Sequence, residues 1–477
     1  MSSRKSARSV VRFAGAWFAL SMAMASVVVP NASGQNPGGG GGGNTGGGGV
    51  PNTLVSFGAV GGVAIDAQGV LNNLEVDQLN RLRGVWQKAA KQVPGDINEP
   101  TELRKVSLRR LEAAIADHLA KGTPLPDEIR LLGGLQQIRY VFVFPEENDI
   151  VLAGFGEGWK IDDRGTVVGM TTGHPVLQLD DLLVALRTAD GAARTGISCS
   201  IDPTQEGLAR MQQFVKTIDN VGDDPRPAIA GIEQTLGPQK ITVTGVPATS
   251  HFAQVLVAAD YRMKRLAMGF EPSPVKGMPS FLTMTNGTGN MMPRWWMAPN
   301  YEPMLKDPEG LAWELRGSSV KAMTEDSIMG ANGQLQPVSQ KKGKKAKASV
   351  AQKWADSMTK NYEAISHDLP IFAELSNIMD LAVVAALIHK ENLTGKAGFS
   401  MPVLTDSNDL AAAQFDAPRQ VDPKASFVKK GDNYIITASG GVLIDSWSLA
   451  GNNQVSSDLA PARKKATPTD PARWWWN

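Results

Sequence analysis

The stretch that most constrains the fold is residues 240–270, which join a strand pattern to a long amphipathic helix pattern. Ile241 and Val243 alternate with threonines, as in a strand with one buried face. Ser250, or Thr249 before it, offers a hydroxyl oxygen that can cap the helix that follows. The helix is predicted from apolar residues at helical spacing, which are Phe252, Val255, Leu256, Ala259, Met263 and Leu266.

Strand and helix patterns also alternate before this stretch, which predicts an α+β fold: a mixed α/β central domain with hairpins, flanked by helical segments. Asp66 to Gly69 and Asp162 to Gly165 predict hairpin turns in which the aspartate accepts backbone hydrogen bonds. In chain order we expect a signal peptide at 1–34, a Gly-rich flexible tether at 35–50, an N-terminal hairpin plus helices at 51–135, the central α/β domain at 136–335, a basic linker at 336–349, a helical hairpin at 350–400, a weak β segment at 401–455 and a disordered tail at 456–477.

Two further segments carry many aromatic or loop-forming residues. Residues 271–300 are rich in Pro, Gly, Met and Asn, which predicts long loops around one strand at 281–285. Within them, Arg294, Trp295 and Trp296 are a candidate binding surface, because arginine and aromatic residues are enriched where partners bind. Packing of the tryptophans beneath a loop is the alternative. The terminal run Trp474-Trp475-Trp476 could be a docking tag or a tail with no defined partner.

The N-terminal segment predicts export to the periplasm or the extracellular space. Its basic start is followed by an uncharged apolar run at 13–29, and small residues precede Gln35 as in a cleavage site. A retained anchor is the alternative, but the run has 17 residues where a span usually needs about 20. No other apolar run is long enough to span a membrane. We therefore expect no integral membrane span after signal cleavage.

Charge and cysteine content exclude several classes of protein. Loss of residues 1–34 removes four cations and takes the formal net charge from +1 to −3. A slightly acidic protein has no general attraction for nucleic acid, so we expect no nucleic-acid partner. Cys199 is the single cysteine, so no internal disulfide can form. It alternates with Ile197 and Ile201, which predicts a buried thiol and not a nucleophile.

Motifs for catalysis or cofactor binding are missing, and we expect no cofactor. The histidines show no metal-ligand spacing, and there is no G-x-S-x-G elbow. Carboxylates cluster near Asp149 and Asp162, where they could serve glycoside hydrolysis, Ca²⁺ binding or simply turns. His251 is the most suggestive histidine, since the positive N-terminus of its helix would favour the neutral ring that a general base requires. Asp260 precedes Lys264 by four residues, the spacing of a helix ion pair.

Several long phrases carry a family resemblance. They lie at 144–154 (FPEENDIVLAG), 175–186 (PVLQLDDLLVAL), 199–203 (CSIDP), 240–263 and 293–296 (PRWW). These phrases resemble an uncharacterised family of exported proteins from planctomycete bacteria, known as a domain of unknown function, over roughly residues 55–405. The resemblance implies an exported bacterial protein and brings no known activity, cofactor or catalytic residue.

Taken together, the residues favour a non-catalytic exported protein, a binding or structural component of the cell envelope. Its partner would be an unknown envelope protein or a small ligand. The alternative is an exported hydrolase with a loop-built site near His251, Asp260 and Arg262, to which Asp149 or Asp162 would be contributed from the β region.

Overall fold

The computed structural model describes residues 59–66, 68–73, 95–162, 164–218, 221, 223–285, 292–317, 320–324, 327–329, 335–337, 349–430, 432–468, 470 and 473–477. The predicted signal peptide, the Gly-rich tether and the basic run at 341–347 lie outside these residues. The described chain combines helices with two mixed sheets, so the predicted α+β fold is confirmed.

The first sheet has six strands. In sheet order they are β14 (Val320–Thr324), β11 (Arg294–Pro299), β20 (Ser439–Ile444), β9 (Ile197–Asp202), β10 (Gln239–Thr244) and β17 (Gln420–Val421). Only the pair β11–β20 is parallel within this sheet. β20 can lie this close to β11 because residue 440 is Gly: its φ is +118°, and a Cβ there would sit 1.8 Å from the Trp295 carbonyl oxygen.

The second sheet has seven strands. In sheet order they are β21 (Asn453–Val455), β12 (Met304–Lys306), β13 (Ala312–Glu314), β5 (Tyr140–Phe144), β6 (Asp149–Gly156), β4 (Thr101–Ser107) and β22 (Trp475–Trp476). The last strand forms the edge at β4, with Trp475 opposite Val106. The sheet therefore pairs the last strand of the described chain with a strand at 101–107.

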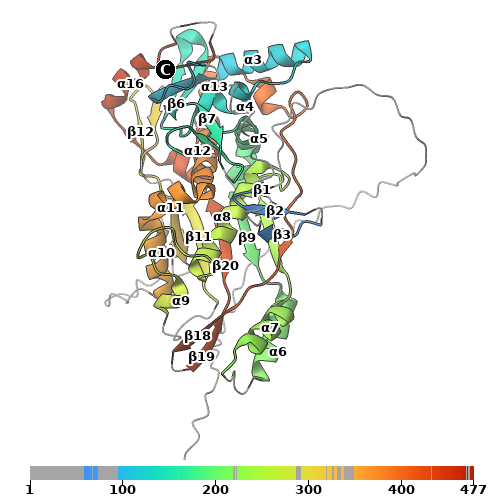
Figure 1. The fold of residues 1–477 in the computed structure, drawn as a ribbon. Coiled ribbons are helices and arrows are strands. Elements are labelled where there is room, and N and C mark those ends of the chain that lie inside the picture. Colours follow the sequence, from blue (N-terminus) through green and yellow to red (C-terminus); the bar gives the residue numbers. More distant parts are fainter. Residues whose placement is uncertain are drawn as a thin grey trace, which may run out of the picture.

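A central helix, α12 (Pro370–Lys390), lies in the middle of the molecule (Figure 1). It is apolar around nearly its whole circumference, as expected for a helix that is covered on all sides. It packs against α5 (Leu179–Thr195), α8 (His251–Ala267) and α15 (Ser446–Gly451). We expected no further run of membrane-spanning length, but α12 has 21 residues, and its most apolar 18-residue window has a mean hydropathy of 1.9. Of its most apolar window, 89% is buried inside the fold.

The helix predicted from residues 240–270 forms as expected. The Ser250 hydroxyl oxygen accepts a hydrogen bond from the Ala253 amide at 3.1 Å, which is the predicted cap of α8. The predicted apolar stripe of this helix is buried. The strand before it, β10, pairs with β9, and α8 packs across β9 and β20.

A helical hairpin separates β9 from β10. It consists of α6 (Gln205–Lys216) and α7 (Arg226–Leu236), and it has a small core of its own around Met211, Ile232 and Leu236. Together with the hairpin of β18 (Ser426–Lys430) and β19 (Asp432–Ile436), it lies at the opposite end of the molecule from the C-terminus (Figure 1).

Both predicted hairpin turns are confirmed. The first joins β2 (Val63–Ile65), which also pairs with β1 (Ala59–Val60), to β3 (Leu71–Asn73), and the second joins β7 (Trp159–Ile161) to β8 (Val167–Gly169). One oxygen of Asp66 accepts from two amides at 2.9 Å, and one oxygen of Asp162 does so at 2.9 and 2.8 Å. The remaining elements are α3 (Leu108–Lys121), α4 (Asp127–Arg130), α9 (Phe281–Met284), α10 (Val350–Lys360), α11 (Tyr362–Asp368), α13 (Leu393–Ala397), α14 (Pro402–Thr405), α16 (Ala460–Lys465), β15 (Ser327–Met329) and β16 (Leu335–Pro337).

Two predictions are wrong. The strand expected at 281–285 is the short helix α9, because the Ser280 hydroxyl caps it through the Thr283 amide. The tail expected to be disordered contains α16 and β22 in its described part, and its three tryptophans are at most 8% exposed. The tail is ordered because β22 pairs with β4 and because two guanidinium groups lie over the Trp475 ring, those of Arg104 at 5.0 Å and Arg473 at 5.6 Å.

Candidate functional site

The two ends of α8 carry the features that could form a site, and the first is a charged cluster at its N-terminus. His251 Nδ1 lies 2.9 Å from an Asp181 carboxylate oxygen, and His251 Nε2 lies 3.9 Å from Glu374. These three side chains, which we call the His251 cluster, are at most 11% exposed. Asp181 stands in the first turn of α5, and Glu374 near the start of α12, so three helix N-termini converge here. The positive ends of α5 and α8 favour the Asp181 carboxylate.

The carboxylates determine the charge of the histidine. Burial lowers the pKa of His251, but the charge and the hydrogen bond of Asp181 outweigh burial and raise this pKa to about 9. Burial also raises the pKa of Glu374, to about 7. We expected the helix dipole to keep the ring neutral, and the nearby carboxylates reverse that expectation. A ring that is protonated at neutral pH cannot accept a proton, so this geometry does not provide a general base.

A segment without helix or strand at 411–419 covers the His251 cluster. The Ala413 amide donates to Asp180 at 3.0 Å, and the Phe415 amide donates to the Thr249 carbonyl at 2.7 Å. The Phe415 ring lies 5.8 Å from the His251 ring. The cluster is therefore closed by a segment that is tied to the N-termini of both α5 and α8.

Asp260 and Lys264 form the ion pair that their spacing predicts. The Lys264 ammonium lies 2.7 Å from one Asp260 oxygen and also donates to the carbonyls of Ile201 at 3.2 Å and Gly440 at 3.0 Å. The Asp260 side chain is fully buried, and its other oxygen has no hydrogen-bond partner among the described residues. Burial raises the pKa of Asp260 to about 7. The pair ties α8 to two strands of the six-stranded sheet, which is a structural role.

Arg262 points away from both of these groups. It donates to the Gly61 carbonyl at 3.0 Å and bonds to Glu271, which Arg265 also contacts. His251 and Asp260 are nine residues apart on one helix, which is about 13 Å along its axis. The three residues of the hydrolase alternative therefore have separate partners and do not meet in one site.

The hydrolase alternative also considered Asp149 and Asp162, and these two carboxylates lie in different parts of the fold. Asp149 is buried and accepts from the Ser107 hydroxyl at 2.5 Å and the Arg109 amide at 3.2 Å, so it supports the start of α3. Asp162 stands in the β7–β8 turn, close enough to Glu374 for its charge to raise the pKa of that carboxyl. Only Asp162 thus lies near the His251 cluster.

The second feature is an open cleft beside the C-terminal end of α8, with an enclosed volume of about 40 Å³; the space is about 420 Å³ only when open solvent at its mouth is counted. It lies where the α6–α7 hairpin leaves the sheet. Its apolar wall consists of Ile201, Tyr261, Met268, Phe270, Val421 and Ala438. We call it the α8 cleft, because three residues of α8 and the C-cap residue Met268 line it at spacings of i, i+3, i+4 and i+7 from Tyr261. This helical periodicity is the signal of the cleft that the sequence contains.

The charged groups of the α8 cleft differ in how they are paired. The three donors of Lys264 meet three protein acceptors. Arg265 contacts Glu271, and its guanidinium lies 5.5 Å from the Tyr261 ring centroid. Asp422 and Lys424 stand exposed at the rim, and neither has an ion pair within the described part of the chain. The interior of the cleft is thus mainly apolar, and its charged groups are paired with other groups of the protein. Its rim carries charges that solvent or a ligand can reach.

The predicted binding surface around the tryptophan pair is only partly exposed. Trp295 is fully buried, with its ring centroid 5.1 Å from that of Phe281 and 4.9 Å from that of Trp354. This corrects its placement on a surface: β11 is an internal strand of the sheet, and residue 295 faces the core. Trp296 and Arg294 lie on the other face, where the guanidinium is 5.5 Å from the indole ring and 3.1 Å from Asp202.

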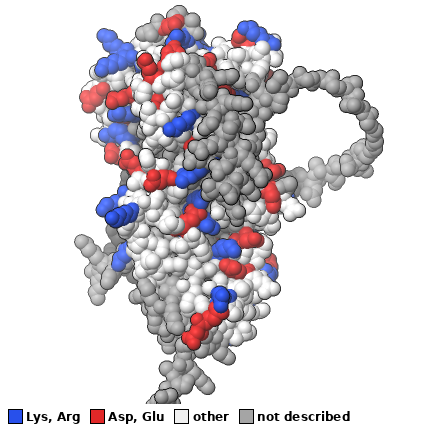
Figure 2. Space-filling view, in the orientation of Figure 1, with Lys and Arg blue, Asp and Glu red and all other residues white. Residues whose placement is uncertain are grey.

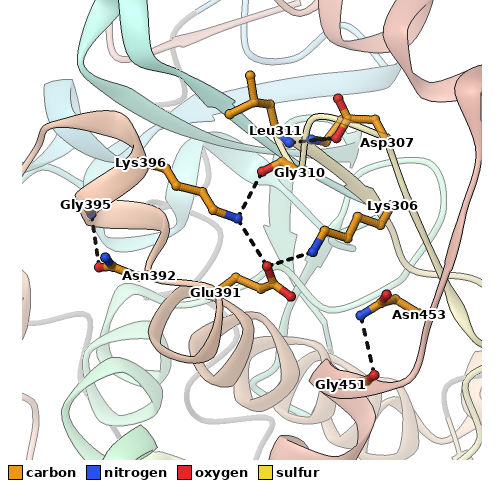
Figure 3. A network of polar contacts seen from close by, with 11 residues as sticks. Lys306, Asp307, Gly310, Leu311, Glu391, Asn392, Gly395, Lys396, Gly451 and Asn453 are labelled. Atoms are coloured by element: carbon orange, nitrogen blue, oxygen red, sulfur yellow. Dashed lines mark hydrogen bonds and ion pairs between the residues drawn. The ribbon is translucent and has the colours of Figure 1, made fainter.

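A third polar network lies at the C-terminal end of α12 (Figure 3). One Glu391 oxygen accepts from Lys306 at 2.8 Å and from Lys396 at 3.1 Å, and both ammonium groups lie over the Trp313 ring. Burial raises the pKa of Glu391, but the two lysine hydrogen bonds outweigh burial and lower it. Lys396 also reaches the Gly310 carbonyl. The network joins α12 and α13 to strand β12, and all three charged side chains are used in that contact.

The described residues offer no metal site, because no group of three or more His, Cys, Asp or Glu side chains among them is arranged to hold an ion. Cys199 is 1% exposed, which confirms its predicted burial, and burial raises the pKa of its thiol. On the face shown in Figure 2, the described cations and anions are interspersed over the surface.

Comparison with known proteins identifies one domain. A family model described as a protein of unknown function (DUF1598) matches residues 199–281, which contain most of β9 and all of the α6–α7 hairpin, β10 and α8. The match lies within the wider resemblance at 55–405. No curated protein and no solved structure matches the chain significantly. Most of the residues that line the α8 cleft belong to the matched domain.

Proposed function

We propose that this protein is an exported, non-catalytic component of the cell envelope that binds a small ligand in the α8 cleft. The observation that carries the proposal is the cleft itself, an open, mostly apolar hollow formed largely by the matched domain. Small-molecule sites have this character: apolar and aromatic walls, with a few polar groups that fix orientation.

The chemistry of the cleft supports binding without turnover. Its buried amine, Lys264, is held by Asp260 and two carbonyls, so it is not free to act on a ligand. The histidine that the sequence favours most for catalysis, His251, lies at the other end of α8 under a covering segment. Export is supported by the basic and apolar segment at 1–34 and by the resemblance to exported planctomycete proteins.

The test of binding is a thermal-shift screen of the mature chain, residues 35–477, with small apolar and aromatic compounds. Compounds that raise the melting temperature are then measured against two cleft variants and one control. Ala438→Leu fills the cleft, Phe270→Ser removes a rim ring that is 37% exposed, and Ala113→Leu adds the same bulk on the exposed side of α3. We expect the shift to vanish in Ala438→Leu, to weaken in Phe270→Ser and to persist in Ala113→Leu.

Two results would refute the binding proposal: no compound stabilises the protein, or the shift is the same in all three variants. Export has its own test. N-terminal sequencing of the protein from envelope and culture fractions should begin at Gln35, whereas a chain that starts at Met1 in the cytoplasm would contradict export.

A further inference from the structure

We infer that residues 411–421, which we call the strap, close over the His251 cluster while that cluster holds its protons, and loosen one wall of the α8 cleft when it loses them. The inference rests on the proposed function, because it makes the binding cleft the site that is regulated. At one end of the strap the Phe415 ring lies 5.8 Å from the His251 ring. At the other end Val421, in β17, forms part of the cleft wall. The strap therefore connects the two ends of α8.

The strap is held by separate hydrogen bonds, spread from the cluster to the cleft. They run from the Ala413 amide to Asp180 at 3.0 Å, from the Phe415 amide to the Thr249 carbonyl at 2.7 Å, from the Gln254 side chain to the Asp416 carbonyl at 2.7 Å, and from the amides of Arg419 and Gln420 to the Gly69 carbonyl at 2.8 and 3.1 Å. Only its last two residues belong to a strand, β17, at an edge of the six-stranded sheet. A segment held in this way opens at a lower free energy than the core does.

The charges around the His251 ring come from several elements. They are Asp180 and Asp181 of α5, Glu374 of α12, Asp162 of the β7–β8 turn and Arg130 of α4, which acts on Asp180. The strap meets the ring with the uncharged Phe415 side chain, and its own charged residues, Asp416 and Arg419, are exposed. Carboxylates outnumber cations in this group, so each proton that the cluster holds reduces the repulsion within it.

The pKa values of three groups here are shifted upward. Burial lowers the pKa of His251, but the charge and hydrogen bond of Asp181 raise it from 6.5 to about 9. Burial raises the pKa of Glu374 from 4.5 to about 7, and it also raises the pKa of Asp180. When the strap opens, water reaches these groups and their pKa values return toward the ordinary ones. The closed strap therefore binds more protons than the open one.

The sign of the pH dependence follows from these shifts. A raised pKa stabilises the closed strap fully below the ordinary value, and this stabilisation is lost as pH rises through the raised value. Glu374 acts between pH 4.5 and about 7, and His251 between pH 6.5 and about 9. The strap should therefore be closed in acid and loosen progressively as the pH rises to about 9.

The experiment is hydrogen exchange followed by mass spectrometry on the mature chain at pH 5, 7 and 9. Each rate is corrected for the pH dependence of exchange in an unstructured peptide. Peptides around Phe415 report on the end at the cluster, and peptides around Gln420 report on the end at the cleft. Release of one proton changes the opening equilibrium by up to about tenfold per pH unit. Opening at both ends should therefore rise by up to about a hundredfold from pH 5 to pH 7, and again from pH 7 to pH 9.

Two variants assign this dependence to the His251 cluster. Glu374→Gln keeps the size of the side chain and removes its titration, so it should abolish the rise between pH 5 and pH 7 and leave the rise above pH 7. His389→Gln is the matched control. His389 pairs with Asp190 at 2.9 Å, so it joins the same two helices, α12 and α5, at the other end of α12. This control should keep both rises.

Three results would overturn the inference. Exchange near Phe415 that does not change with pH would mean that protons do not close the strap. A change near Phe415 without one near Gln420 would separate the strap from the cleft. An equal change in the amides of β5 and β6 would show unfolding of the whole protein and not opening of the strap. The pH series on the natural chain decides the inference even where a variant does not fold. Because no ligand is used, a compound screen without a binder refutes the proposed function and leaves this result unaffected.

Discussion

Replacement of Trp475 by alanine should destabilise the protein strongly, because the last strand is part of the core. The side chain is 7% exposed, and a tryptophan buries about 150–250 Å². At about 25 cal/mol per Å² this corresponds to about 4–6 kcal/mol, which is an upper value since unfolded chains already hide part of their surface. Measured truncations of large buried side chains cost about 3–5 kcal/mol.

The surroundings of Trp475 place the expected loss within that range. Arg104 is fully buried and lies over the indole ring, so the substitution also removes a cation–π contact of about 1 kcal/mol. Its guanidinium keeps hydrogen bonds to backbone carbonyls, including that of Ile97 at 3.1 Å, and is not left unpaired. We therefore expect a loss of about 4 kcal/mol, a large part of the total for an ordinary domain.

The measurement is urea unfolding followed by far-UV circular dichroism, which does not depend on the tryptophan that is removed. Val455→Ala is the matched control, since it lies on the opposite edge strand of the same sheet with 64% of its side chain exposed. It should change the free energy of unfolding by less than about 0.5 kcal/mol. A Trp475→Ala loss below about 1 kcal/mol would mean that the tail does not fold cooperatively with the sheet, and the reasoning would be wrong.

Two further predictions concern buried charges. Burial raises the pKa of Asp380 to about 7, and a carboxyl with a raised folded pKa contributes stability that is present below its unfolded pKa and lost as pH rises. The urea concentration at the midpoint of unfolding should therefore fall as the pH rises from 4 to 7. Asp380→Asn should reduce the change in the free energy of unfolding over this range by up to about 4 kcal/mol. A variant with the same pH dependence as the natural chain would contradict this reasoning. Lys264→Met should cost about 3–5 kcal/mol, more at pH 8 than at pH 5, because it leaves Asp260 buried without its cation. The double variant with Asp260→Asn should recover most of the loss in urea unfolding, and a double variant as unstable as the single one would refute the explanation.

Local features of the fold could be predicted from the sequence because they depend on neighbours along the chain. The Ser250 cap, the Asp260–Lys264 pair and the turn at Asp162 each involve residues within four positions of one another. The backbone and side-chain chemistry of such short segments is nearly independent of the rest of the protein. These predictions are confirmed.

Features that depend on distant partners could not be predicted. His251 meets Asp181 from 70 residues away, and nothing near it in the sequence indicates that a carboxylate will reverse its expected charge state. Trp475 likewise pairs with a strand near the other end of the chain, so a hydrophobic tail of unknown destination could not be distinguished from a folded edge strand. Within the α8 cleft, helix spacing indicates the wall from α8, whereas the opposite wall from Val421 and Ala438 has no local signal.

The polar side chains of α12 hold several separate parts of the chain, among them the N-terminus of α8, against this one helix. Glu374, Asn377 and Asp380 are buried on an otherwise apolar helix. They contact, in turn, the His251 ring, the Pro175 carbonyl and the Ile138 amide, so each fixes a different part of the chain against the same helix. The N-terminus of α8 is held by the first of these contacts and by a covering segment. Among the described residues, the C-terminal end of α8 makes no hydrogen bond or ion pair with these three side chains, and it opens to the cleft in which we propose that a ligand binds.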